Sequence, residues 1–190
     1  MYSKSTTTKE NIMLAVIKLL EHYDINEINI SYIAKEADVA VGLINYHFKS
    51  KEKLFEMAIE SYIVESIQKE SNAMTTLSLK PLEQLSVSIK GYADFLARNR
   101  KIYRYFLLNH LAGNKESEST YLGYLYYMPI LKEIKKDCEE TDLIILIYQI
   151  VNSIQVTFLK NEILKDKTKL DFFCQEDREQ LVDKLICNLL

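Results

Sequence analysis

Glycine and proline are scarce in this chain, and this limits the folds that it can adopt. Its 190 residues contain four glycines and two prolines. Hairpin turns depend on residues that accept positive φ values, glycine above all, so a turn-rich sheet protein is disfavoured. The apolar residues recur instead at spacings of three and four, which place them on one face of a helix. We therefore expect an all-α protein.

Charge and cysteine content narrow the class of protein that this chain can belong to. The net charge is −3, so any DNA binding has to come from a local surface rather than from the whole molecule. Cys138, Cys174 and Cys187 are widely spaced, which suggests neither a disulfide framework nor a zinc site. The most apolar stretch is interrupted by Gln149 and Asn152, which disfavours a membrane span. We expect a cytoplasmic protein without a cofactor or membrane contact.

Three short helices are predicted in the first fifty residues. Thr7 and Glu10 have the spacing of a capping box, which predicts the start of the first helix. Asn29 is a suitable N-cap for the second. Asp38 then interrupts the pattern, and because aspartate accepts a left-handed backbone it suits a tight turn between two crossed helices. A third helix is predicted from about residue 40 to residue 47.

The rest of the chain predicts a larger helical unit. Ser50 is a suitable N-cap for a long helix that ends near Asn72 and bridges two domains. Apolar residues cover several sides of the last two predicted helices, which favours packing against a partner pair. We divide the chain into residues 1–50 and 51–190. The further helices are predicted over residues 81–98, 101–111, 119–138 (kinked or restarted at Pro129), 142–164 and 176–190.

Hydrogen-bond donors gather where the third helix ends. Tyr46, His47, Lys49 and Lys51 lie close together in sequence, and residues 49–53 carry a net charge of +2. Such donors suit phosphates. Lys51 opposes the dipole of the helix that it begins, unless a phosphate binds at that N-terminus. The alternative is a structural cluster in which the aromatic rings pack in the core and His47 caps a helix.

Residues 33–48 (IAKEADVAVGLINYHF), followed by KSKEKL, resemble the helix-turn-helix of the TetR family of transcriptional regulators. The resemblance implies an N-terminal three-helix DNA-binding domain and a C-terminal helical domain that binds a ligand and dimerises. The sequence differs from the family pattern at Asp38, Ala40 and Asn45, where Gly, Ser or Thr, and Tyr are usual. The three-helix unit closes at about residue 50, and the family plan of about nine helices covers the rest without obvious motifs.

The resemblance also implies how the third helix meets DNA. That helix would enter the major groove, Gly42 would allow close approach, and the tyrosine, histidine and lysine side chains would hold phosphates. Val41 and Leu43 offer no donors, so contacts with thymine methyl groups and indirect readout are expected to contribute. The predicted DNA-binding residues are Lys4, Asn29, Ser31, Ala40, Val41, Gly42, Leu43, Asn45, Tyr46, His47, Lys49 and Lys51.

Tyrosines concentrate in the second unit, where seven of thirteen lie between Tyr92 and Tyr127. An aromatic surface with polar tips suits a flat or cationic organic ligand. A core with hydroxyl groups at its surface is the alternative, and it is favoured for most of them. The resemblance places a ligand pocket among the helices predicted at 51–72, 81–98, 119–138 and 142–164. The predicted ligand-binding residues are Tyr62, Tyr92, Phe95, Phe106, Tyr124, Asn152 and Phe158.

Four basic residues, Arg98, Arg100, Lys101 and Arg104, follow one another closely. They suit an acidic effector, although a solvated helix end is the commoner role of such a cluster.

The resemblance, together with these features, predicts a ligand-responsive transcriptional regulator, a repressor that a small hydrophobic or aromatic effector releases from double-stranded operator DNA. Helices 142–164 and 176–190 are expected to form a four-helix homodimer interface. No nucleophile with a neighbouring base, phosphate-binding glycine loop or metal-ligand spacing indicates an enzyme. The alternative is a helical ligand-binding or partner-binding protein without operator binding, because the N-terminal unit has no excess of basic side chains.

Overall fold

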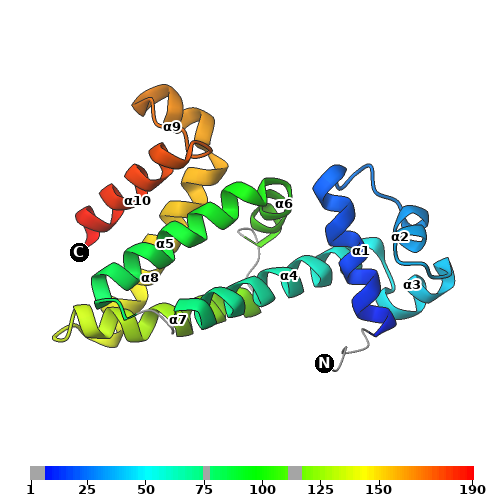
Figure 1. Ribbon diagram of the computed structural model, residues 1–190, viewed down its shortest axis with the longest axis horizontal. Helices are drawn as coiled ribbons and strands as arrows, with labels where there is room; N and C mark the ends of the chain where they lie inside the picture. Colours follow the sequence, from blue (N-terminus) through cyan, green and yellow to red (C-terminus); the bar gives the residue numbers. More distant parts are fainter. Residues whose placement is uncertain (1–6, 75–77, 111–116) are drawn as a thin grey trace.

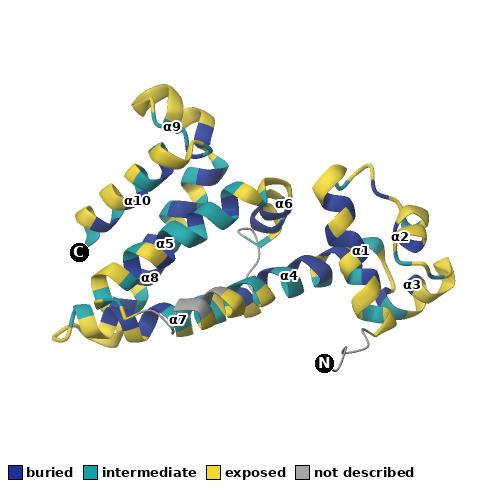
Figure 2. Ribbon diagram, in the orientation of Figure 1, coloured by how far each residue is buried: buried dark blue, intermediate teal, exposed yellow. Residues whose placement is uncertain are grey.

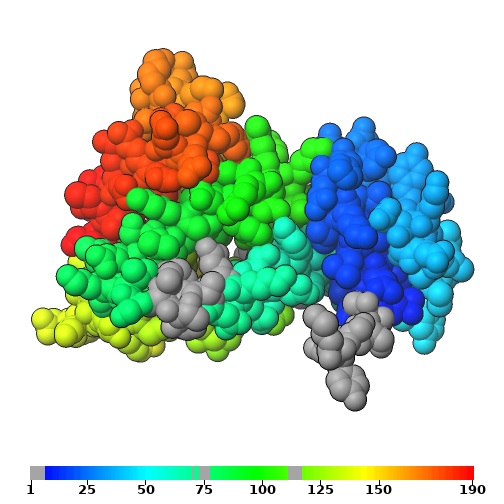
Figure 3. All heavy atoms as spheres, viewed as in Figure 1, coloured from blue at the N-terminus to red at the C-terminus, as the bar shows by residue number. Residues whose placement is uncertain are grey.

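The computed structural model describes residues 7–74, 78–110 and 117–190, and within these ranges it contains ten α-helices and no strand. The all-α class is as predicted. Helices α1–α3 occupy one end of the molecule, and α4 runs from them into the larger body (Figure 1, Figure 3). The helices are α1 (Thr8–His22), α2 (Ile30–Glu36), α3 (Val41–Phe48), α4 (Lys51–Met74), α5 (Pro81–Arg98), α6 (Arg100–His110), α7 (Glu118–Ile134), α8 (Glu140–Leu159), α9 (Asn161–Thr168) and α10 (Gln175–Leu189).

The predicted helix starts in the N-terminal unit are confirmed. Thr7 and Glu10 form a capping box, in which the Thr7 N–H donates to Glu10 Oε2 (2.7 Å) and the Glu10 N–H donates to Thr7 Oγ1 (3.2 Å). The Asn29 side chain accepts from the Tyr32 N–H at 2.9 Å and so caps α2. Asp38 has a φ of 53°, the left-handed conformation expected for the turn between α2 and α3.

The core of the N-terminal unit is closed by α4. Ile33 of α2 and Ile44 and Phe48 of α3 are buried, and Leu54 and Phe55 from the first turns of α4 belong to the same apolar cluster. Helix α1 also packs along α4. Helix α4 is therefore held in this unit at one end and in the larger body at the other, and it connects the two.

The prediction of one helix over residues 142–164 is wrong in one respect. In the structure this segment is divided at Lys160 into α8 and α9. Asn161 is buried at the start of α9. Its side chain accepts from the Phe172 N–H (2.7 Å) and donates to Asp171 Oδ1 (3.1 Å). These bonds tie α9 to the segment before α10, which gives ten helices instead of about nine. Apolar periodicity carries no signal for such a break.

Helix α7 continues through Pro129 and ends at Ile134. The predicted restart at this proline is therefore not observed, and the helix is shorter than the predicted 119–138. The predicted helix over 81–98 is confirmed as α5, with Pro81 at its first position, where the missing N–H removes no hydrogen bond.

A buried ion pair fixes α10 to α5. Arg178 Nε and Nη2 lie 2.7 and 2.6 Å from Asp94 Oδ1, and Nη1 donates to the Phe172 carbonyl at 2.9 Å. The Arg178 side chain is 8% exposed and that of Asp94 is 29% exposed. The guanidinium is therefore satisfied on several sides, as a buried cation requires.

Candidate DNA-binding surface and ligand cavity

Helix α3 turns one face into the core and leaves the other open. Ile44 and Phe48 are buried, whereas Val41, Leu43 and Tyr46 are among the exposed large apolar residues. Figure 2 colours each helix by burial. The Tyr46 ring is 81% exposed. A structural role in the core therefore does not hold for Tyr46. An aromatic and apolar face of this kind suits a partner surface.

The outer face of α3 is also open at its backbone. A Cβ atom added at Gly42 would meet no atom within 4 Å. Ala40 precedes the helix and offers no side-chain cap, so the first N–H groups of α3 have no side-chain acceptor at that position. The predicted residues Val41, Gly42, Leu43 and Asn45 are exposed on this short helix, and Ala40 is exposed just before it.

The turn from α3 to α4 is held by Ser50. Its hydroxyl accepts from the Lys53 N–H at 3.1 Å, so the predicted N-cap is confirmed. The pKa of Glu52 lies below its ordinary value because its carboxylate accepts from its own backbone N–H and from Ser50. Lys49 is exposed at a φ of 59°, and His47, half-buried, has its ring centroid 5.2 Å from that of Tyr46.

Lys51 lies at this surface but is engaged within the chain. Its Nζ donates to the Ile25 carbonyl at 3.2 Å and lies 5.4 Å from the centroid of the Phe55 ring. The ammonium has three donors, so this bond leaves others for a phosphate. The contact also anchors α4 to the loop between α1 and α2.

The remaining predicted DNA contacts lie in α2 and in the N-terminal arm. Ser31 is exposed in the first turn of α2. The Asn29 side-chain oxygen caps that helix by accepting from the Tyr32 N–H. Lys4 lies outside the described residues.

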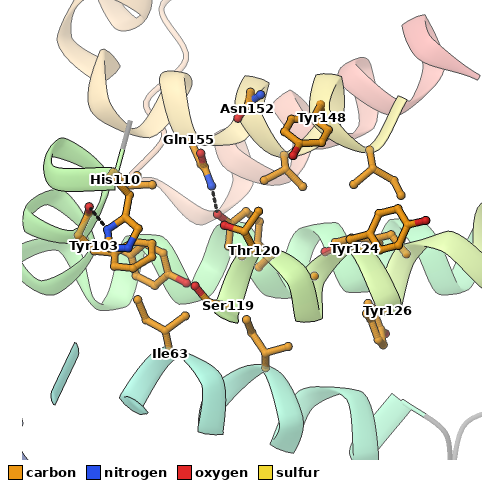
Figure 4. Close-up of a pocket in the computed structure, with 18 of the residues that line it drawn as sticks. Ile63, Tyr103, His110, Ser119, Thr120, Tyr124, Tyr126, Tyr148, Asn152 and Gln155 are labelled. Carbon is orange, nitrogen blue, oxygen red and sulfur yellow. Dashed lines mark hydrogen bonds between the residues drawn. The ribbon is translucent and has the colours of Figure 1, made fainter. Parts of the chain in front are cut away.

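A cavity of about 500 Å³ lies within the larger body, lined by residues of α4, α5, α6, α7 and α8 (Figure 4). This volume is typical of small-molecule sites. Four of the predicted ligand-binding residues line it, Tyr92, Phe106, Tyr124 and Asn152. Its described lining contains no Lys, Arg, Asp or Glu side chain, so it suits an uncharged, largely apolar ligand or part of one.

Tyr62, Phe95 and Phe158 do not line this cavity. The Tyr62 ring stacks on Phe95 with centroids 5.8 Å apart, and its hydroxyl donates to Asn99 Oδ1 at 2.8 Å. These contacts link α4 to the end of α5.

Phe158 packs instead against Phe172 and Phe173, at centroid distances of 5.9 and 5.8 Å. The face that each helix turns toward the cavity decides these placements, and residue type does not.

The polar groups of the cavity are partly paired with one another. Gln155 Nε2 donates to the Tyr92 hydroxyl at 2.9 Å, and Ser88 and Tyr126 share a hydrogen bond of 2.8 Å. Burial raises the pKa of Tyr92 to about 12, and the bond from Gln155 opposes that rise. The Gln155 side-chain amide therefore has a partner within the chain.

Sequence reasoning missed the end of the cavity nearest α4, where His110 and Ser119 line it. Glu60 Oε1 accepts from the Ser119 N–H at 2.8 Å. Its other oxygen, Oε2, is buried without a hydrogen-bond partner and lies 3.9 Å from His110 Nε2. Glu60 therefore connects α4 directly to the cavity wall, a link between residues far apart in sequence.

Helix α8 carries an exposed apolar stripe that includes Ile145, Tyr148 and Val156. By length and composition alone this helix is apolar enough to cross a membrane, and a third of that window is buried within the chain. The described residues contain no group of three or more His, Cys, Asp or Glu side chains that could hold a metal ion.

Comparison with known proteins places this geometry in context. Residues 12–58 match the family described as bacterial regulatory proteins, tetR family. Curated protein sequences give no significant match.

Several solved structures are similar over nearly the whole chain. FadR, a transcriptional regulator from Bacillus subtilis in complex with stearoyl-CoA, has a TM-score of 0.64 and 21% identity, over 94% of this chain and 96% of that one. A Clostridium perfringens protein proposed to regulate fatty acid metabolism has a TM-score of 0.60 and 28% identity, over 95% and 96%. AlkX, a TetR family repressor from a Dietzia species, has a TM-score of 0.62 and 15% identity, over 99% and 97%.

Proposed function

Because the chain belongs to the TetR family of transcriptional regulators, we propose that it is a repressor that a hydrophobic ligand in the cavity releases from operator DNA. Residues 1–50 form the DNA-binding domain, and residues 51–190 form the ligand-sensing and dimerisation domain. The observation that carries the proposal is the outer face of α3, where Tyr46 is 81% exposed beside other apolar side chains. The site of action is the cytoplasm, where operator DNA lies.

The acting form is a homodimer. The exposed stripe of α8 presents Ile145 and Val156, and burying such residues against a second copy removes apolar surface from water. Helix α10 packs on α8, so the two helices together can form a four-helix interface with those of the second copy. A two-fold dimer presents two α3 helices, which suits half-sites about 34 Å apart.

Helix α4 transmits the signal. Ile63 and Ile67 of this helix line the cavity, and Leu54 and Phe55 at its other end lie in the DNA-binding core. A ligand that favours another position of α4 changes the spacing of the two α3 helices. Coupling of this kind is worth about 1–3 kcal/mol in characterised systems, or roughly 5–150-fold in operator affinity.

The ligand has a substantial apolar part. The cavity is lined by aliphatic side chains and six tyrosines, with no charged side chain among its described residues. FadR from Bacillus subtilis, which has a similar fold, was crystallised with stearoyl-CoA, and this supports an acyl chain or a similar apolar group as the part that enters.

Operator binding is tested with duplexes selected from a random pool by the purified protein. Tyr46→Ala removes an exposed ring, so it should leave stability unchanged and weaken binding at least about tenfold, which corresponds to 1.4 kcal/mol. Tyr121→Ala, which removes another exposed tyrosine, 51% exposed on α7, is the matched control and should bind as the unchanged protein does.

Salt dependence tests the phosphate contact at Lys49. Lys49→Gln removes one charge from each subunit, so the slope of log affinity against log salt should fall by about 1.8 for a dimer. Selection of no duplex, or equal binding by the Tyr46 and Tyr121 variants, would favour the alternative of a ligand-binding or partner-binding protein without operator binding.

A further inference from the structure

A second pocket, of about 130 Å³, lies where α6 begins and where α8 gives way to α9. Three cationic side chains line it, Arg100, Arg104 and Lys160, together with the aromatic rings of Phe158 and Phe173. Cations gathered around one small pocket repel each other, so the arrangement is stabilised when an anion lies between them.

The cations of this pocket are not neutralised within the described part of the chain. Arg100, Arg104 and Lys160 have no carboxylate within ion-pair distance there, whereas Lys90, Lys101 and Lys165 do. The lining contains one acidic residue, Glu162, whose Oε1 accepts from Asn161 Nδ2 at 3.3 Å. The pocket therefore keeps an excess of two positive charges.

Arg100 is held in place for recognition. Its guanidinium carbon lies 4.1 Å from the centroid of the Phe173 ring, a cation–π contact that restrains the group beside the pocket. The planar guanidinium carries several N–H donors that suit phosphate oxygens. The positive end of α9, whose first residues line the same pocket, adds to the favourable potential.

The small pocket and the large cavity lie along the same two helices. Tyr103 and Phe106 of α6 line the cavity, whereas Arg100 and Arg104 line the small pocket. On α8, Gln155 lines the cavity and Phe158, one turn later, lines the small pocket. Three residues of a helix rise about 4.5 Å, so the linings of the two spaces are adjacent along α6 and α8.

We propose that the two pockets form one bipartite effector site, with an apolar chain in the cavity and a phosphate-bearing head group on Arg100, Arg104 and Lys160. The inference rests on the proposed function, since it concerns the same effector. It explains why the cavity carries no charged side chain among its described residues: the charge of the ligand is bound elsewhere. It also gives a role to Arg100 and Arg104, two of the four residues of the basic cluster predicted from the sequence.

Calorimetric titration with three probes tests this arrangement, because the probes carry the apolar chain, the phosphates or both. Decanoyl-CoA has the chain and the phosphates, the decanoyl thioester of N-acetylcysteamine has the chain alone, and CoA has the phosphates alone. The unchanged protein should bind decanoyl-CoA at least about tenfold more tightly than either other probe, and more weakly as salt is raised.

Single substitutions then locate the head group. Arg104→Gln and Lys160→Gln should each weaken decanoyl-CoA binding about tenfold and reduce its salt dependence, with no change for the thioester. Arg98→Gln is the matched control, because Arg98 belongs to the same basic cluster in sequence but does not line the pocket, and it should change neither affinity.

Three results of these titrations, besides a failure to bind, would overturn the inference. They are equal decanoyl-CoA binding by the pocket variants and the unchanged protein, equal losses for the thioester and decanoyl-CoA, and CoA binding as tight as that of decanoyl-CoA. The last result would instead describe an independent anion pocket. Failure of any chain-bearing probe to bind would also overturn it, whereas the proposed regulation stands or falls separately on the Tyr46 experiment.

Discussion

Replacement of Gly123 by leucine should stabilise the protein while it weakens ligand binding. Gly123 lies inside α7 and lines the cavity, and a Cβ atom there would meet no atom within 4 Å. Glycine within a helix costs about 1 kcal/mol relative to alanine or leucine. The variant should therefore gain about 1 kcal/mol, which raises the melting temperature by roughly 2–4 °C in a chain of this length.

Ligand binding should weaken, because the leucine side chain adds four carbons to the cavity at Gly123. A ligand that loses burial of an equal number of methylene groups loses about 3 kcal/mol, or roughly a hundredfold in affinity. Thermal melting measures the first effect, and titration with the decanoyl thioester measures the second.

Gly123→Ala separates the two effects, because it provides the same gain in helix stability with a much smaller side chain. Its melting temperature should equal that of the leucine variant, and its affinity for the ligand should be close to that of the unchanged protein. If the leucine variant melts lower than the unchanged protein, or binds the thioester with undiminished affinity, the position does not face open cavity space as described.

Three further predictions concern stability. Asp94→Asn leaves the Arg178 guanidinium buried without its counter-ion, so urea denaturation should show a loss of about 3 kcal/mol; a loss below about 1 kcal/mol would contradict this. The pKa of Asp171 is lowered, chiefly by the hydrogen bond from Lys165. Ionised Asp171 therefore adds to the free energy of unfolding above pH 3.8, the ordinary pKa of the group, and this stabilisation is lost as the pH falls below it. Asp171→Asn should flatten the stability profile in that acidic range, and an unchanged profile would refute it. The pKa of Tyr92 is raised from 10.0 to about 12, so the unfolded state ionises first and stability falls as pH rises between these values; Tyr92→Phe should reduce that fall, as measured by unfolding at alkaline pH.

The starts of the N-terminal helices could be read from short-range chemistry. The capping box of Thr7 and Glu10, the N-caps Asn29 and Ser50 and the left-handed turn at Asp38 each depend on residues within a few positions. Such signals survive in a linear sequence because the groups that satisfy them are neighbours along the chain.

The cavity could be predicted only in part, because helical spacing does not say which face of a helix meets which neighbour. Tyr92 and Phe95 lie on the same helix with similar side chains, yet the first lines the cavity and the second stacks on Tyr62. The break at Lys160 was missed for a related reason, since Asn161 is held by residues ten and eleven positions later.

The sequence by itself determined the helical class, the helix-turn-helix and the residues on the outer face of α3, because these depend on local propensity and on a motif with fixed spacing. The tertiary structure decided what lies between the helices. It brought Glu60 to Ser119 across 59 residues and placed Arg100 against Phe173. Contacts of this kind arise when separate apolar faces pack together, and the pairing of those faces is a property of the whole core rather than of any segment.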